Sequence, residues 1–227
     1  MPNTIKHPEL SQYIDHTNLK ATATKNDIIA LCNEAKTYRF FSVCVNSSYV
    51  ALAKSALQDS TVKVCCVVGF PLGAMSTTGK VEETKQALKD GAEEIDLVLN
   101  IGLLKSEDFE SVKNDIKAVK ACLPDLVLKV ILETCYLEDS EIVTASELAI
   151  EAGADFIKTS TGFGTAGANL HDVNLMLNTA NGSALVKASG GIKDYETAMK
   201  YINLGVKRIG TSSGIAIVTG QTSTENY

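Results

Sequence analysis

Three lysines lie within short apolar runs of the sequence. Lys129 stands between Leu and Val, Lys158 between Ile and Thr, and Lys187 between Val and Ala. Lysine is rarely buried in a protein unless it has a partner or a chemical task, although a lysine at a strand end can also extend its ammonium group to water. Three such lysines in successive runs favour a shared site over three separate side chains at the surface.

Lysines grouped in this way can act as nucleophiles. Neighbouring parallel strands are about 4.8 Å apart, so lysines at similar height on adjacent strands feel one another's charge. A nearby ammonium group and partial desolvation both favour the neutral amine. Because a neutral amine attacks an aldehyde carbonyl, the pattern predicts Schiff-base chemistry on a carbonyl substrate.

Asp96 places a carboxylate in a fourth apolar run, Glu94-Ile95-Asp96-Leu97-Val98. One interpretation is a salt bridge that satisfies a buried lysine, and the other is a proton-transfer group beside the Schiff base. The two are compatible, because a paired aspartate can also move protons through a water molecule. The histidines of the chain show no metal-ligand spacing, and Schiff-base chemistry needs neither a metal nor an organic cofactor, so we expect none.

Glycine-rich turns follow the last three apolar runs. In α/β barrels the loops after strands seven and eight often bind phosphate, because glycine lets backbone N–H groups approach the oxyanion and serine adds further donors. A phosphorylated small molecule is therefore the expected substrate. The residues predicted to bind it from these turns are Thr161, Gly162, Gly190, Gly191, Lys193, Gly210, Ser212 and Ser213.

Eight apolar runs must position these residues, and helical stretches separate them. Most of the runs are rich in β-branched or aromatic residues and carry polar residues at their C-terminal ends, which suits parallel strands covered by helices. The predicted strands are 13–16, 41–46, 62–69, 94–99, 127–133, 156–160, 184–188 and 208–211.

The helical stretches carry start and stop patterns. A capping box begins at Thr24, Asp194 can cap a helix that ends at Gly205, and residues 138–152 place acids in a first helical turn. Repeated βα units predict a single-domain α/β protein, a (βα)8 TIM barrel, over 1–219, with a flexible C-terminal tail over 220–227. A doubly wound sheet fits less well, since no Gly-x-Gly-x-x-Gly follows the first strand.

Composition excludes several other classes of function. The chain has 227 residues, a formal net charge of −6 and six cysteines. No Lys/Arg run suggests nucleic acid, no apolar run reaches the ~18 residues of a membrane helix, and the N-terminus lacks a signal-peptide pattern. Without metal-finger or disulfide spacings, we expect a cytoplasmic protein with reduced thiols and neither nucleic-acid nor membrane partners.

Over nearly the whole chain, the motifs and their order along the sequence resemble those of the deoxyribose-phosphate aldolase family. The resemblance implies a metal-independent class I aldolase that reversibly cleaves 2-deoxy-D-ribose 5-phosphate to acetaldehyde and D-glyceraldehyde 3-phosphate. It also implies a homodimer. The most specific blocks are Leu128-Lys129-Val130-Ile131-Leu132-Glu133, Phe156-Ile157-Lys158-Thr159-Ser160-Thr161-Gly162, Val186-Lys187-Ala188-Ser189-Gly190-Gly191-Ile192 and Gly210-Thr211-Ser212-Ser213.

The same resemblance implies roles for individual residues. Lys158 would form the Schiff base, Lys187 would favour its neutral amine, and Asp96 would relay protons together with Lys187. Thr17 and Lys129 would lie next to the substrate.

The phosphate pocket and the tail are expected to differ between family members. Phe163 stands where some members carry a lysine, and Lys193 could supply that charge instead. Tyr227, the last residue, is similar to the terminal tyrosine of members whose tail reaches the active site, which makes it a candidate proton carrier.

Two other functions are compatible with parts of the pattern. A phosphosugar isomerase or epimerase would use Asp96 as a base without a covalent step, and a non-catalytic barrel would only bind a phosphorylated metabolite. The isomerase gives Lys158 and Lys187 no reason to be buried together, and the non-catalytic barrel predicts tight ligand binding without turnover. A metal-dependent aldolase is disfavoured, because no two histidines stand at ligand spacing.

Overall fold

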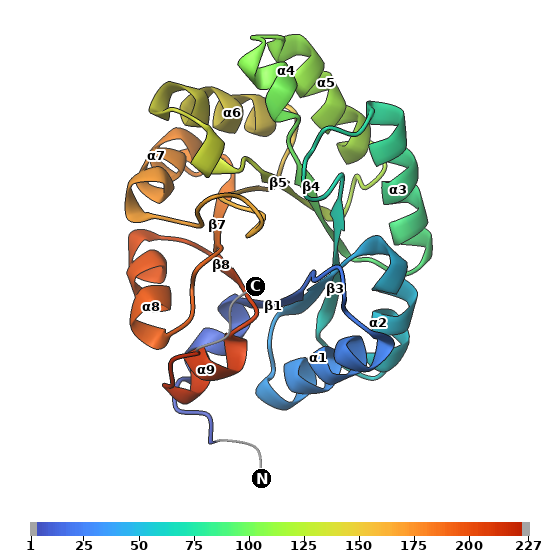
Figure 1. Ribbon diagram of the computed structural model, residues 1–227, viewed down its shortest axis with the longest axis vertical. Helices are drawn as coiled ribbons and strands as arrows, with labels where there is room; N and C mark the ends of the chain where they lie inside the picture. Colours follow the sequence, from blue (N-terminus) through green and yellow to red (C-terminus); the bar gives the residue numbers. More distant parts are fainter. Residues whose placement is uncertain (1–3, 224–227) are drawn as a thin grey trace.

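Eight parallel strands close into a barrel in the order of the sequence, and strand β1 pairs with β8 (Figure 1). The computed structural model describes residues 4–223. The predicted (βα)8 architecture is therefore confirmed. The strands are β1 Ile14–Asn18, β2 Ser42–Val45, β3 Lys63–Val68, β4 Glu94–Val98, β5 Val127–Ile131, β6 Phe156–Lys158, β7 Leu185–Ser189 and β8 Arg208–Thr211.

Helices form a ring outside the barrel, as Figure 1 shows. Three short 3-10 helices, η1 Pro8–Tyr13, η2 Ser47–Tyr49 and η3 Thr134–Tyr136, supplement them. The α-helices are α1 Lys25–Tyr38, α2 Val50–Ala56, α3 Thr77–Lys89, α4 Ile101–Lys105, α5 Phe109–Lys120, α6 Asp139–Glu151, α7 Leu170–Ala180, α8 Tyr195–Leu204 and α9 Gly214–Thr219.

The predicted helix ends agree with the local hydrogen bonds. The Thr24 side chain accepts from the backbone N–H of Asp27, and the Asp27 side chain accepts from Thr24 in return, which completes the capping box. Asp194 caps α8, and Gly205 ends this helix with a φ of 118° that favours glycine. These contacts fix where the helices begin and end relative to the strands.

Strand ends differ from the predictions by one or two residues. The first strand begins one residue later than expected because Tyr13 belongs to η1, and it runs on to Asn18. The sixth is shorter than predicted and ends at Lys158. Beyond it, the backbone N–H of Thr161 donates a hydrogen bond to the side chain of Glu133, which follows β5, instead of to a neighbouring strand. Lys158 therefore stands at the edge of the barrel mouth.

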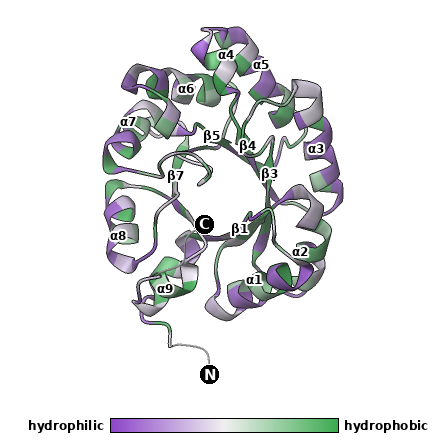
Figure 2. Cartoon of the chain, viewed as in Figure 1, coloured by the Kyte–Doolittle hydropathy of each residue, from purple (hydrophilic) through white to green (hydrophobic). Residues whose placement is uncertain are grey.

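The main apolar core lies between the strands and the helices. Figure 2 shows hydrophobic stretches along the strands and on the helix faces turned toward them. A second, smaller cluster consists of Leu19, Cys44, Cys65 and Val67, with Phe70 packed against it. Much of the remaining interior is charged, which is unusual for a barrel core that aliphatic side chains normally fill.

The start of the predicted flexible tail is held by backbone hydrogen bonds. The N–H of Gln221 donates to the carbonyl of Ala216 at 2.8 Å, and that of Ser223 donates to the carbonyl of Lys193 at 3.1 Å. Residues 224–227 lie outside the described part of the chain. Within 4–223, no helix combines the length and the apolar character needed to cross a bilayer.

Candidate active site

Asp96 is the centre of a buried charge cluster inside the barrel. Its Oδ2 atom is 2.8 Å from Nζ of both Lys158 and Lys187, and its Oδ1 atom is 2.9 Å from Nζ of Lys129. Strand register explains the grouping, because Asp96 pairs with Lys129 across β4 and β5, and Lys158 pairs with Lys187 across β6 and β7. The predicted convergence of three lysines and one carboxylate is therefore present.

The three lysines differ in their access to the mouth. Lys129 and Lys187 are 0% exposed, whereas Lys158, the last residue of β6, is 3% exposed. Asp96 Oδ2 bridges the side-chain nitrogens of Lys158 and Lys187. The repulsion expected between these two lysines is therefore offset by a carboxylate that contacts both.

Asp15 is a member of the cluster that the sequence reasoning missed. Its Oδ2 atom is 2.6 Å from Nζ of Lys187, and its Oδ1 atom accepts a 2.7 Å hydrogen bond from the Ser42 hydroxyl. Glu94 pairs with Lys129 at 2.6 Å in the same way, and Arg208 lies near both acids. The sequence offered one indication for Asp15, its place directly before His16 and Thr17 at the end of the predicted first strand.

Electrostatics within the cluster stabilise the charged forms. Burial by itself would raise the pKa of Asp96, but Lys129, Lys158 and Lys187 outweigh it and hold the pKa well below the usual range. Burial likewise opposes the charge of Lys187, yet Asp15 and Asp96 raise its pKa above the ordinary value. The two carboxylates therefore favour the protonated form of Lys187.

Acid should destabilise the protein through these carboxylates. The pKa values of Asp15 and Asp96 are lower in the folded chain than the ordinary value of about 3.9, so the unfolded state binds more protons in acid. Their contribution is fully present above about pH 4 and is lost as the pH falls through the folded pKa values. We expect the melting temperature to fall steeply below pH 4, measured by circular dichroism, and less steeply in Asp96→Asn. Equal slopes in both proteins would contradict this.

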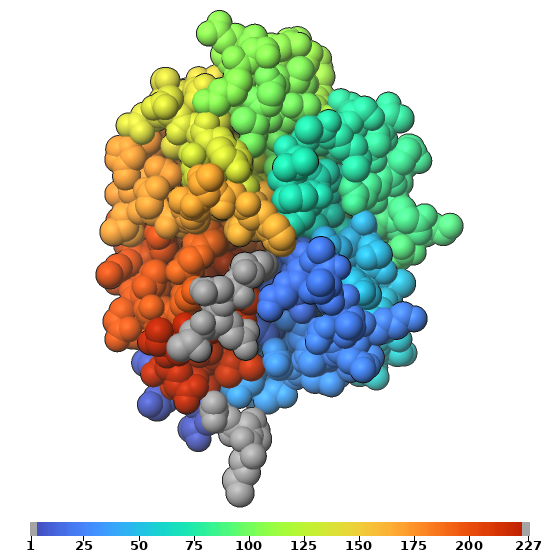
Figure 3. All heavy atoms as spheres, in the orientation of Figure 1, coloured from blue at the N-terminus to red at the C-terminus, as the bar shows by residue number. Residues whose placement is uncertain are grey.

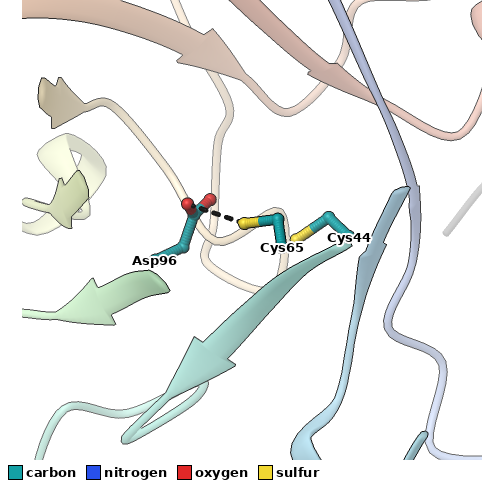
Figure 4. A group of neighbouring side chains, drawn as sticks. All are labelled: Cys44, Cys65 and Asp96. Carbon is teal, nitrogen blue, oxygen red and sulfur yellow. Dashed lines mark hydrogen bonds between the residues drawn. The ribbon is translucent and has the colours of Figure 1, made fainter. Parts of the chain in front are cut away.

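Cys44 and Cys65 extend the cluster on the side of β2 and β3 (Figure 4). Within residues 4–223, their Sγ atoms and a carboxylate oxygen of Asp96 lie within 4.8 Å of one another, as in a metal site. Both Asp96 oxygens already face ammonium groups, however, and burial raises the pKa of the Cys65 thiol well above its usual range. The Cys65 thiol donates to Asp96 Oδ1 at 3.1 Å. We therefore interpret the thiol as a hydrogen-bond donor that helps to hold the carboxylate.

Most residues predicted to bind phosphate surround one small pocket at the ends of β7 and β8. It measures about 30 Å³. Gly190 and Gly191 have φ angles of 85° and 79°, which few other residues adopt, so the backbone needs glycine here. The pocket is lined by Gly190, Gly191, Ile192, Lys193, Gly210, Thr211, Ser212 and Ser213.

Gly210 has a second function in packing. A Cβ atom at this position would lie 2.9 Å from Cβ of Ser189 and 3.0 Å from Cε of Lys187. Glycine is therefore needed for the side chain of Lys187 to pass along β8 toward Asp96. The same residue lines the small pocket at the ends of β7 and β8.

Other predicted residues lie apart from this pocket. Thr17 lines a neighbouring cavity of about 230 Å³, together with Ser212. Thr161 directs its hydroxyl group to Glu133. Gly162 follows it with a φ of 88° and open space where a side chain would stand. Tyr227 lies outside the described residues, so its role stays a prediction.

Comparison with known proteins places this chain in a family. The sequence profile described as DeoC/LacD family aldolase matches residues 10–220. The chain belongs to the DeoC/LacD aldolase family. A relative from Carboxydothermus hydrogenoformans, named deoxyribose-phosphate aldolase, is 53% identical over 98% of this chain and 100% of its own length. One from Finegoldia magna with the same name is 56% identical over 93% of this chain and 100% of its own.

A solved structure gives the same family relationship in three dimensions. The deoxyribose phosphate aldolase of Aeropyrum pernix, described as a tetramer, superposes with a TM-score of 0.87 at 33% identity. The similarity covers 93% of this chain and 90% of that one. The family shares the barrel, so the charge cluster stands on a scaffold that carries aldolases.

Proposed function

We propose that this chain is a class I aldolase that reversibly cleaves 2-deoxy-D-ribose 5-phosphate to acetaldehyde and D-glyceraldehyde 3-phosphate. Lys158 is the proposed Schiff-base residue. The observation that carries this proposal is that Lys158, the last residue of β6 and 3% exposed, has its amine 2.8 Å from Asp96 Oδ2. Lys129 and Lys187 are completely buried, so a sugar that enters from the mouth meets Lys158 first.

The proposed reaction begins when the neutral amine of Lys158 attacks the C1 aldehyde of the open-chain sugar. The carbinolamine loses water and becomes an iminium ion. As the C3 hydroxyl loses its proton, the electron pair of the C2–C3 bond moves toward the iminium nitrogen, and glyceraldehyde 3-phosphate departs. Protonation of the enamine at C2 and hydrolysis then release acetaldehyde and restore Lys158.

Asp96 and Lys187 are the proposed proton carriers for these steps. Asp96 Oδ2 contacts both amines at 2.8 Å, so the two lysines and the carboxylate form one hydrogen-bonded path. Lys187 is favoured in its protonated form and can donate that proton, with a water molecule, to the oxygen that leaves the carbinolamine. Lys129 is proposed to fix the other oxygen of Asp96, 2.9 Å away.

The glycine-rich pocket at β7 and β8 is the proposed site for the 5-phosphate. Its backbone has the open conformation that phosphate binding needs, and Lys193 and the serines at 212 and 213 line it. Thr17, Thr161 and Gly162 complete the proposed substrate-binding set from the neighbouring loops. Phe163 packs edge-on against Phe70, with ring centres 5.2 Å apart, which gives that part of the mouth an apolar wall.

The charge of Asp96 argues against an isomerase or epimerase that uses this residue as its base. Burial would raise the pKa of Asp96, but the three lysines outweigh it and hold this pKa well below the usual range. Such a carboxylate is too weak a base to remove a proton from carbon efficiently, although it can still pass protons between the nitrogen and oxygen atoms that it contacts. The covalent mechanism instead gives each of these lysines a task.

The remaining proposals concern assembly and location. We propose that the chain consists of a barrel domain, residues 1–219, and a C-terminal tail, residues 220–227. We also propose that it is cytoplasmic, that two copies form a homodimer, and that it uses neither a metal nor an organic cofactor. Because the Aeropyrum pernix protein is described as a tetramer, light scattering is needed to distinguish the states. A dimer would have twice the 24.2 kDa mass of one chain.

Borohydride trapping tests the proposed function. The purified protein is incubated with 2-deoxyribose 5-phosphate, reduced and digested for peptide mass spectrometry. We expect an ethyl group on Lys158, because reduction of the acetaldehyde imine leaves that group on the amine. Folded protein without an adduct would contradict the aldolase mechanism.

A further inference from the structure

Glu133 is a buried carboxylate that the proposed reaction steps do not use. It follows β5 at the mouth of the barrel and is 2% exposed. Its backbone has a φ of 56° in the left-handed region, which residues other than glycine adopt infrequently. Such a conformation persists where the surrounding contacts require it, and the side chain of Glu133 makes contacts of this kind.

Both oxygens of Glu133 accept hydrogen bonds from one residue. The backbone N–H of Thr161 donates to Oε1 at 3.1 Å, and the hydroxyl group of Thr161 donates to Oε2. The Thr161 oxygen in turn accepts from the N–H of Phe163 at 3.0 Å. At Gly164, an added Cβ would lie 3.1 Å from Cδ of Glu133, so the loop packs closely on the carboxyl group.

The bonded segment crosses the mouth. We call residues 159–169 the strap. At its far end, the N–H of Ala168 donates to the carbonyl of Ser189 at 3.0 Å, and Gly167 packs on the backbone of Gly190. Figure 3 shows the segment after β6 extending over the middle of this face toward the chain that follows β3, where Phe163 meets Phe70. The strap therefore joins Glu133 to the first residue of the pocket proposed for phosphate.

We propose that Glu133 is a positioning residue whose carboxylate fixes the strap and thereby sets the affinity for the phosphorylated substrate. The inference rests on the proposed aldolase function. A carboxylate suits this task because it offers acceptors to two donors at once, whereas a glutamine offers one oxygen and one NH2 group. Without it, Thr161 would lose both acceptors in a buried place, and the strap would shift to find others.

Three substitutions separate the carboxylate from the backbone conformation. Glu133→Gln keeps the size and one acceptor. Glu133→Gly removes the carboxylate but favours the left-handed backbone. Glu133→Ala removes the carboxylate without favouring that backbone conformation. Asp115→Asn is the matched control, because Asp115 is also a buried carboxylate but pairs with Lys80 on the outer side of the barrel.

The experiment measures kcat and KM with 2-deoxyribose 5-phosphate and with 2-deoxyribose, together with borohydride trapping of acetaldehyde. We expect KM for the phosphorylated sugar to rise roughly 10- to 100-fold in Glu133→Gly and Glu133→Ala, and by less in Glu133→Gln. We expect kcat to change less than about threefold and trapping on Lys158 to persist. KM for 2-deoxyribose should rise less than KM for its phosphate. Asp115→Asn should lower the melting temperature and leave KM unchanged.

Two results would overturn the inference. A wild-type KM in Glu133→Gly would mean that only the backbone turn matters, and a loss of kcat and trapping at constant KM would mean that Glu133 acts on the chemistry. If Glu133→Gly and Glu133→Ala do not fold, Glu133→Gln still tests the inference. An unchanged KM in that variant would show that two acceptor oxygens are not needed at this position. A wild-type protein that traps no acetaldehyde would instead overturn the aldolase function on which the inference rests.

Discussion

Lys158→Leu is expected to abolish aldol cleavage. The substitution preserves an apolar, bulky side chain at the end of β6 but removes the amine 2.8 Å from Asp96 that the mechanism requires as nucleophile. Loss of a covalent nucleophile typically lowers kcat by on the order of 10⁴-fold or more. Cleavage of 2-deoxyribose 5-phosphate would be followed through the release of glyceraldehyde 3-phosphate, and borohydride trapping would be repeated on the variant.

Two further lysine variants make the result specific. Lys158→Arg keeps a positive charge but forms no imine, so it should be as inactive as Lys158→Leu if the covalent step matters. Lys80→Met removes another completely buried lysine, which pairs with Asp115 between α3 and α5. It should destabilise the fold and leave trapping on Lys158 intact. Substantial cleavage by Lys158→Leu would show that the reaction does not require this amine and would contradict the covalent mechanism.

Asp96→Asn is expected to lower both activity and stability. The amide keeps the shape but removes the negative charge that faces Lys129, Lys158 and Lys187. Because uncompensated charge then stays buried, we expect the free energy of unfolding to fall by about 3 to 5 kcal/mol. Loss of the proton path should lower kcat by roughly 10²- to 10⁴-fold.

Denaturant unfolding and steady-state kinetics measure these two effects separately. Asp115→Asn is again a useful reference, since it also disrupts a buried ion pair but lies outside the barrel interior. A similar loss of stability with normal kcat in that variant would assign the kinetic effect of Asp96→Asn to the site. Wild-type kcat in Asp96→Asn would remove Asp96 from the proton path.

The sequence predicted the barrel well because its patterns depend on short-range physics. Alternating apolar runs and capped helices are readable residue by residue, and Thr24 and Asp194 start helices where the capping rules expect. Strand order in a parallel barrel then places Lys129, Lys158 and Lys187 on neighbouring strands. Side chains alternate between the two faces of a strand, so inward-facing residues of neighbouring barrel strands share one interior. The three lysines meet Asp96 there.

The contacts that sequence reasoning missed depend on closure and on loop conformation. Asp15 reaches Lys187 because β1 pairs with β8 and brings together residues 172 positions apart. Glu133 contacts Thr161 because the chain leaves β5 in a left-handed conformation. No local sequence pattern at Glu133 predicts that conformation. Such pairings depend on the tertiary structure, so periodicity alone does not give them.

The crowding around Gly210 limits how this enzyme can change. One backbone position borders the pocket proposed for phosphate on one side and the stem of Lys187 on the other. A mutation there that reshapes the pocket for a different substrate would therefore also displace a lysine of the proposed proton path. Selection for a new specificity, in nature or in the laboratory, should avoid this strand end and act instead on the exposed side of the mouth, where Phe163 and Leu72 have room to vary.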